Sequence, residues 1–217
     1  MAISFIGSTS QTVGGTPAVF QINSMSINNA AGVILNCDVE IYSGTISLLN
    51  GNLNNGTHLV FDASENIVRS AGTLGTAPSF VSGINVTYTG NVTTGNELPS
   101  GPFNLGNLTI NTSGTVTLGA DATANGVLTF TSGKLALGSH NLTMGSSPGT
   151  ISGANSSTYV VTNGTGSLVQ NVGSSDVTYP IGTASAYNQV VLNNTGGTAD
   201  NYSVLVASGT TDRKSVV

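Results

Sequence analysis

The sequence has few charged side chains and a single cysteine, and each shortage excludes a class of protein. Charged residues make up 6% of the 217 residues, against roughly 25% in an ordinary soluble domain. Only 4 are Lys or Arg, against 9 Asp or Glu, and no basic cluster exists that would bind nucleic acid or an anionic membrane surface. No apolar run approaches the roughly 20 residues of a membrane helix, so membrane insertion is not expected. Cys37 is alone, so the fold must depend on packing and backbone hydrogen bonds.

The two ends of the sequence lack the features of an exported protein's natural termini. Residues 1–7 have neither the basic start nor the apolar stretch of a signal peptide. If the protein is exported, we expect its true start to lie outside this sequence. The string DRKSVV at 212–217 holds two of the four basic residues and resembles the translated start of a sequencing adapter. We therefore expect 212–217 to be a non-native tail, with a genuine basic tail as the alternative.

The apolar residues that are present, 38% of the chain, follow the period of short β-strands. They occur as doublets two positions apart, separated by Gly, Asn, Ser or Thr. No window shows the spacing of an amphipathic helix, and Gly recurs too often for one to be stable. We therefore expect an all-β protein with almost no helix. Examples of the doublets are Leu108/Ile110, Val116/Leu118, Ala122/Ala124, Leu128/Phe130, Leu135/Leu137 and Leu142/Met144.

The doublets belong to an internal duplication, in which residues 24–61 match residues 107–144. Ile27 aligns with Ile110 at an offset of 83 residues, and after one deletion Gly51 aligns with Gly133. Each unit is too thin to bury its own apolar side chains, so the units must stack, as in solenoids. Residues 1–155 are therefore expected to form a parallel β-solenoid or β-helix-like repeat region. An antiparallel β-sandwich is the competing architecture.

The pattern changes to longer alternating strands after residue 155, where four of the six tyrosines lie. Alternation of apolar and polar residues is typical of antiparallel strands with one solvated face. We expect residues 156–211 to form an antiparallel β cap or an incomplete β-sandwich.

Four strings in the chain resemble the repeat regions of large secreted surface proteins of Bacteroidetes. They are NLTIN at 107–111, LTFTSGKLALG at 128–138, YVVTNGTG at 159–166 and TYPIGT at 178–183. Those proteins are adhesin-like, and many end in a type IX secretion sorting domain. The resemblance implies an extracellular or cell-surface location and a structural or adhesive role, with glycans or other cell-surface components as partners. It implies no particular functional residue.

Two pairs of polar residues recur in the duplication. His58 and His140 are repeat equivalents, as are Asp38 and Asp121. A pair of stacked imidazoles would suggest a metal site, but no Cys, Asp or Glu stands at ligand spacing beside either histidine. We expect the histidines to be corner residues and the aspartates to cap turns. The sequence thus indicates no metal site and no cofactor.

Asp62, Glu65 and Arg69 form the only charged cluster outside the tail. The simplest interpretation is an exposed loop between repeats, and a ligand contact with carbohydrate or calcium is the alternative. The spacing Asp-x-x-Glu lacks the alternating oxygen ligands of a calcium loop. These three residues are the only candidates for contact with a ligand, and the sequence indicates no catalytic residue.

The sequence favours a structural or adhesive repeat module without catalytic activity. Two other functions stay open. A carbohydrate-binding or ice-binding solenoid would use flat ladders of Thr, of which Thr115/Thr117 and Thr129/Thr131 are fragments. A polysaccharide-active β-helix enzyme would need several acids together with Arg or Lys in one groove. Outside the tail only Arg69 and Lys134 are available.

Overall fold

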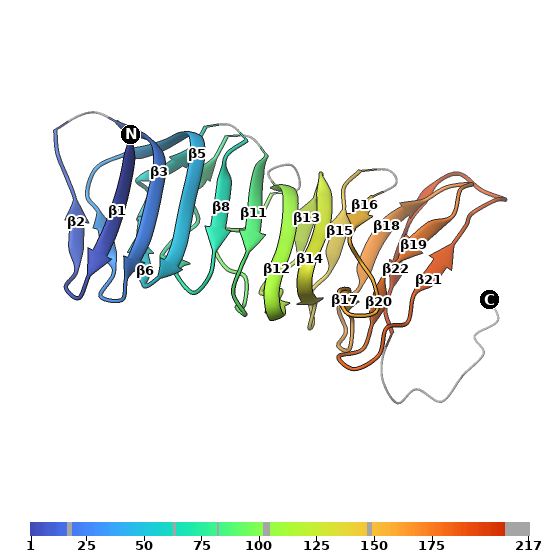
Figure 1. The fold of residues 1–217 in the computed structure, drawn as a ribbon. Helices are drawn as coiled ribbons and strands as arrows, with labels where there is room; N and C mark the ends of the chain where they lie inside the picture. Colours follow the sequence, from blue (N-terminus) through green and yellow to red (C-terminus); the bar gives the residue numbers. More distant parts are fainter. Residues whose placement is uncertain (17–18, 63, 82, 102–104, 147–148, 207–217) are drawn as a thin grey trace.

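The computed structural model describes residues 1–16, 19–62, 64–81, 83–101, 105–146 and 149–206, which form strands and no helix. The strands wind into an elongated parallel β-solenoid of about eight turns, with antiparallel strands at its C-terminal end (Figure 1). The predicted architecture, an all-β solenoid followed by antiparallel strands, is confirmed.

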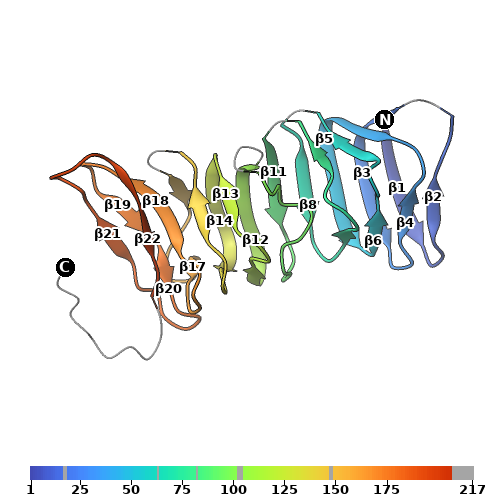
Figure 2. The ribbon, with the colours of Figure 1, turned by 180° about the vertical axis from the view of Figure 1, so that it is seen from behind.

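Rows of parallel strands form the sides of the coil, and backbone hydrogen bonds between neighbouring turns run along its long axis (Figure 2). The longest row contains β1 (Ala2–Gly7), β3 (Phe20–Asn29), β5 (Val39–Asn50), β8 (Asn66–Arg69), β11 (Ile84–Tyr88), β12 (Leu105–Thr117), β14 (Val127–Ala136) and β16 (Thr150–Ser152). A second row contains β2 (Gln11–Val13), β4 (Val33–Leu35), β6 (Asn52–Asn54) and β9 (Thr73–Leu74). The N-terminal part of β5 is extended by β7 (Leu59–Phe61) and β10 (Ser79–Phe80).

The long strands bend so that they pass from one side of the coil to the next. In β12 the pairing with β14 changes register between Ile110 and Thr115. Glycines lie at such bends: the repeat equivalents Gly51 and Gly133 have φ angles of 81° and 82°. A Cβ atom at Gly51 would lie 1.8 Å from the carbonyl oxygen of Asn29. Only glycine is free of both the steric and the φ penalty there, which explains why it occurs in both halves.

The interior of the coil is filled by the apolar doublets that the sequence singled out. Every member of these pairs is buried, because side chains alternate between the two faces of a strand. The doublets of the first half are Met25/Ile27, Val33/Leu35, Val39/Ile41, Ile46/Leu48 and Leu59/Phe61, and the six doublets of the second half are buried in the same way.

Side chains of successive turns stack in columns along the interior. One column runs from Ile27 through Leu48, Arg69 and Tyr88 to Ile110, each paired with the next in adjacent strands. Ile27 and Ile110 are therefore four turns apart, so the offset of 83 residues between the duplicated halves corresponds to four turns.

Parallel pairing continues past residue 155, the expected end of the solenoid. The strands β17 (Val160–Val161) and β20 (Ile181–Gly182) extend the C-terminal part of β14, while β13 (Ala122–Ala124), β15 (Leu142–Met144) and β18 (Leu168–Val172) form another parallel row. Antiparallel pairing joins β22 (Asp200–Val204) to β18, and β19 (Val177–Tyr179) to β21 (Val190–Leu192). The predicted non-native tail at 212–217 lies outside the described residues.

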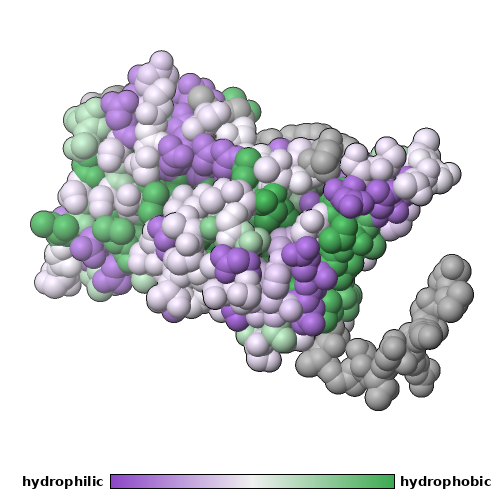
Figure 3. Space-filling model, turned by 45° about the vertical axis from the view of Figure 1, so that its right-hand side comes forward, coloured by the Kyte–Doolittle hydropathy of each residue, from purple (hydrophilic) through white to green (hydrophobic). Residues whose placement is uncertain are grey.

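The C-terminal end also has the most apolar part of the visible surface (Figure 3). Val191 of β21 and Tyr202 of β22 are exposed there, together with Leu205 beyond the end of β22. Elsewhere in this view smaller apolar spots are scattered among polar and intermediate residues.

Candidate functional site

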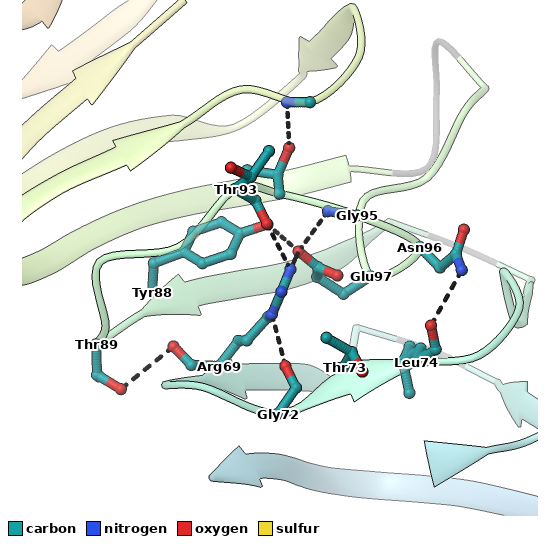
Figure 4. Close-up of polar contacts among 12 residues, drawn as sticks. Arg69, Gly72, Thr73, Leu74, Tyr88, Thr89, Thr93, Gly95, Asn96 and Glu97 are labelled. Atoms are coloured by element: carbon teal, nitrogen blue, oxygen red, sulfur yellow. Dashed lines mark hydrogen bonds and ion pairs between the residues drawn. The ribbon is translucent and has the colours of Figure 1, made fainter. Parts of the chain in front are cut away.

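The most unusual feature of the interior is a polar cluster in a column that is otherwise apolar. Arg69, the last residue of β8, and Tyr88, the last residue of β11, are neighbours in this column. Glu97 reaches them from the irregular segment that follows β11 (Figure 4). The cluster lies between the two duplicated halves of the chain.

Arg69 donates hydrogen bonds to three acceptors inside the coil. Its Nη1 lies 2.5 Å from Oε1 of Glu97 and donates to the carbonyl oxygen of Thr93 at 2.9 Å. Its Nε donates to the carbonyl oxygen of Gly72 at 2.7 Å. The exposed fraction is 6% for Arg69 and 1% for Glu97. Such a buried pair persists only when each charge has close partners, because removing two charges from water costs several kcal/mol per ion.

Tyr88 and the backbone complete the cluster. The Tyr88 hydroxyl donates to Oε1 of Glu97 at 2.6 Å, and the Gly95 N–H donates to the same oxygen at 2.8 Å. Burial of the phenol, reinforced by the adjacent Glu97 carboxylate, raises the pKa of Tyr88 well above its ordinary value. The other carboxylate oxygen, Oε2, is buried and has no hydrogen-bond partner among the described residues. The cluster is closed to solvent, so its role is structural: it holds neighbouring turns together.

The predicted exposed loop at Asp62, Glu65 and Arg69 is only partly correct. Asp62 is half-buried, but Glu65 is 1% exposed and Arg69 is in the interior. Oε1 of Glu65 accepts a hydrogen bond from the N–H of Ser43, a non-glycine residue with a φ of 52°. The expectation of an exposed position is therefore wrong for Glu65 and Arg69. Arg69 pairs with Glu97, a residue that the sequence analysis did not consider.

The repeat-equivalent histidines and aspartates form two similar pairs on the surface. Nδ1 of His58 lies 2.7 Å from Oδ1 of Asp38, and Nδ1 of His140 lies 3.4 Å from Oδ1 of Asp121. Oδ1 of Asp121 also accepts the N–H of Asn141 at 2.9 Å, 20 residues further along the chain. This bond joins two neighbouring turns of the solenoid and is not the local turn cap that the sequence predicted. The two pairs are four turns apart and share no site. Sequence reasoning found all four residues and missed that they pair across one turn.

An open groove of about 590 Å³ crosses the outer surface at the bends of β12 and β14. Hydroxyl groups from several turns line it, including those of Thr115, Thr131, Ser132 and Ser157. Lys134 is at its side: the ammonium donates to the Tyr159 hydroxyl at 2.9 Å and to the carbonyl oxygen of Ala184 at 2.8 Å. We call this the Lys134 groove.

The described residues contain no group of three or more His, Cys, Asp or Glu side chains that could hold a metal ion. They also contain no helix that is long and apolar enough to cross a membrane.

Comparison with known proteins adds no relative. No protein-family model, no curated protein and no solved structure matches the chain.

Proposed function

We propose that this chain is a structural and adhesive repeat module of a larger secreted or cell-surface bacterial protein, without catalytic activity. The observation that supports it is the continuous stack of about eight turns. In such a stack each turn contacts mainly its neighbours, and hydrogen bonds along the axis resist bending and stretching. A rod of this kind holds an attached domain away from the cell and offers a long lateral surface to partners.

The distribution of charge also favours this proposal over an enzyme. Glu65, Arg69 and Glu97 are buried in contacts that hold turns together. The exposed acids Asp38 and Asp121 lie four turns apart, so these two do not form a carboxylate pair. A polysaccharide-active site needs acids that a substrate can reach, and a general acid or base must come within hydrogen-bond distance of it. The resemblance to Bacteroidetes repeat regions adds the expected location, outside the cell, and the expected partners, glycans or other cell-surface components.

The test uses the full-length protein in a bacterium that produces it. Protease added to intact cells is expected to remove the solenoid, and beads coated with the purified chain are expected to attach to glycan-coated or cell-coated surfaces. Beads coated with a Leu35→Asp variant, whose core is disrupted, are the control. A chain that is protected inside intact cells, or beads that attach no better than the control, would contradict the proposal. So would cleavage of a polysaccharide by the purified chain.

A further inference from the structure

The Lys134 groove combines two properties that point to one class of ligand. Its lining is rich in hydroxyl groups, which both donate and accept hydrogen bonds, and Lys134 is the one cation among the described lining residues. We propose that this groove binds a glycan containing a carboxylated sugar, with Lys134 against the carboxylate. This proposal deepens the adhesive role proposed above and rests on it.

The charge distribution supports an anionic ligand. The chain has a formal net charge of -5, yet the described residues that line the groove include no Asp or Glu. Among the described residues, Lys134 is the only Lys or Arg side chain outside the interior, since Arg69 is buried. A cation in a cleft without nearby carboxylates gives a locally positive potential that attracts anions. One ammonium group matches the single negative charge of a carboxylated sugar.

The position of Lys134 is fixed before any ligand binds. Its ammonium donates to Tyr159 and Ala184 and lies 4.5 Å from the centroid of the Tyr159 ring. Tyr159 is itself held, because its hydroxyl donates to the carbonyl oxygen of Thr183 and its ring packs against Tyr187. An ammonium group has three N–H donors, so one is left for a ligand. A side chain held in this way loses little conformational entropy on binding.

The remaining lining suits a sugar ring. The volume of about 590 Å³ lies within the usual range of ligand sites, roughly 300–1,000 Å³. Thr131 is exposed at the groove, while the half-buried Ala136 contributes apolar surface. Hydroxyl groups can hydrogen-bond the hydroxyls of the sugar, and the apolar surface can pack against its C–H groups. Tyr159 is only 1% exposed, so it supports Lys134 and does not touch the ligand.

The test is calorimetric titration of the purified chain with three probes of similar length: an oligogalacturonate, a neutral cello-oligosaccharide and an oligoaspartate peptide. We expect the oligogalacturonate to bind best, and its affinity to fall as salt is added. Lys134→Met, which keeps the length of the side chain, should weaken its binding about tenfold or more. Thr131→Val, which removes one hydroxyl, should weaken binding by about two- to tenfold.

A matched control separates the local effect of Lys134 from net charge. Asn36→Asp changes the net charge of the chain by the same amount at an exposed corner between β4 and β5, and should leave affinity unchanged. Equal binding of the neutral and carboxylated oligosaccharides overturns the proposal. Preference for the peptide, binding that survives Lys134→Met in a variant with an unchanged melting temperature, or no binding at millimolar concentration does the same. Each of these results leaves the protease and bead experiments to decide the structural and adhesive role separately.

Discussion

Nη1 of Arg69 lies 2.5 Å from Oε1 of Glu97 in the interior of the solenoid, between turns whose equivalent positions hold Leu48 and Ile110. The pair ties β8 to the irregular segment after β11, which has few strand pairings of its own. An ion pair replaces apolar packing at the junction of the duplicated halves, where the repeat pattern is interrupted.

Arg69→Leu should therefore destabilise the chain by about 3–5 kcal/mol, because it leaves the Glu97 carboxylate buried without its main partner. Adding Glu97→Gln should restore much of this loss, since the amide is neutral and still offers an oxygen to Tyr88. Chemical denaturation of both single variants and the double variant measures the coupling. Additive losses in the double variant would mean that the two side chains do not depend on each other.

The raised pKa of Tyr88 predicts a loss of stability in alkali. Below the ordinary tyrosine pKa of about 10 the phenol is neutral in both states, and its contribution to stability is complete. Above this pH, Tyr88 ionises in the unfolded chain but stays neutral in the folded chain. The free energy of unfolding therefore falls by up to about 1.4 kcal/mol per pH unit. Tyr88→Phe should be less stable than the wild type at neutral pH, because it lacks the hydrogen bond to Glu97. Between about pH 9 and pH 11 it should lose less stability.

Tyr179 and Tyr187, whose pKa values are also raised by burial, are present in both proteins and cancel in this comparison. Urea denaturation across the pH series gives the two slopes. Parallel slopes would show that Tyr88 ionises in the folded chain as easily as in the unfolded one.

The equivalent glycines at the bends should respond alike to substitution. Gly51→Ala and Gly133→Ala each force a Cβ onto a backbone with positive φ and close to a carbonyl oxygen. Each change should cost more than about 1 kcal/mol, seen as a lower melting temperature. Gly196→Ala is the control, because nothing lies within 4 Å of its added Cβ and its φ is unstrained. A control that melts lower than Gly51→Ala would refute this account of the bends.

The inward doublets should not tolerate charge. Leu35 and Leu118, which are repeat equivalents, are 3% and 2% exposed. Leu35→Asp and Leu118→Asp each bury a carboxylate and remove apolar contacts, so each should cost more than about 3 kcal/mol, enough to unfold a marginal domain. Asn36→Asp, at the exposed position next to Leu35, should change stability by less than about 0.5 kcal/mol. Circular dichroism during heating compares the three, and a folded Leu118→Asp would contradict the inward assignment.

The repetitive parts of this fold were predictable from the sequence, and the irregular parts were not. The period of two in Leu108/Ile110 identified inward positions, because it follows from local backbone geometry. Glu97 has no repeat equivalent and lies 28 residues from Arg69. Periodicity therefore gave no information about its position.

The pairing of surface residues can be predicted only when the number of residues in one turn is known. The sequence pattern gave the offset between the duplicated halves but not the number of turns in it. Asp38 and His58 are 20 residues apart, which is the separation of stacked positions in adjacent turns such as Leu108 and Leu128. Given that spacing, the pair could have been found. The Lys134 groove depends on the bends of β12 and β14, whose register shift no sequence pattern indicated.

The central claim, that the repeats stack as parallel turns in one register, is tested most directly by a disulfide between two outward positions. Thr109 and Thr129 are paired in adjacent parallel strands, and neighbouring strands are about 4.8 Å apart, within the range that a disulfide can bridge. In a Cys37→Ser background, Thr109→Cys with Thr129→Cys should form a cross-link on mild oxidation, detected by mass spectrometry. Thr109→Cys with Thr123→Cys, whose strands are not paired, should not. Efficient cross-linking of the second pair and not of the first would contradict the parallel solenoid.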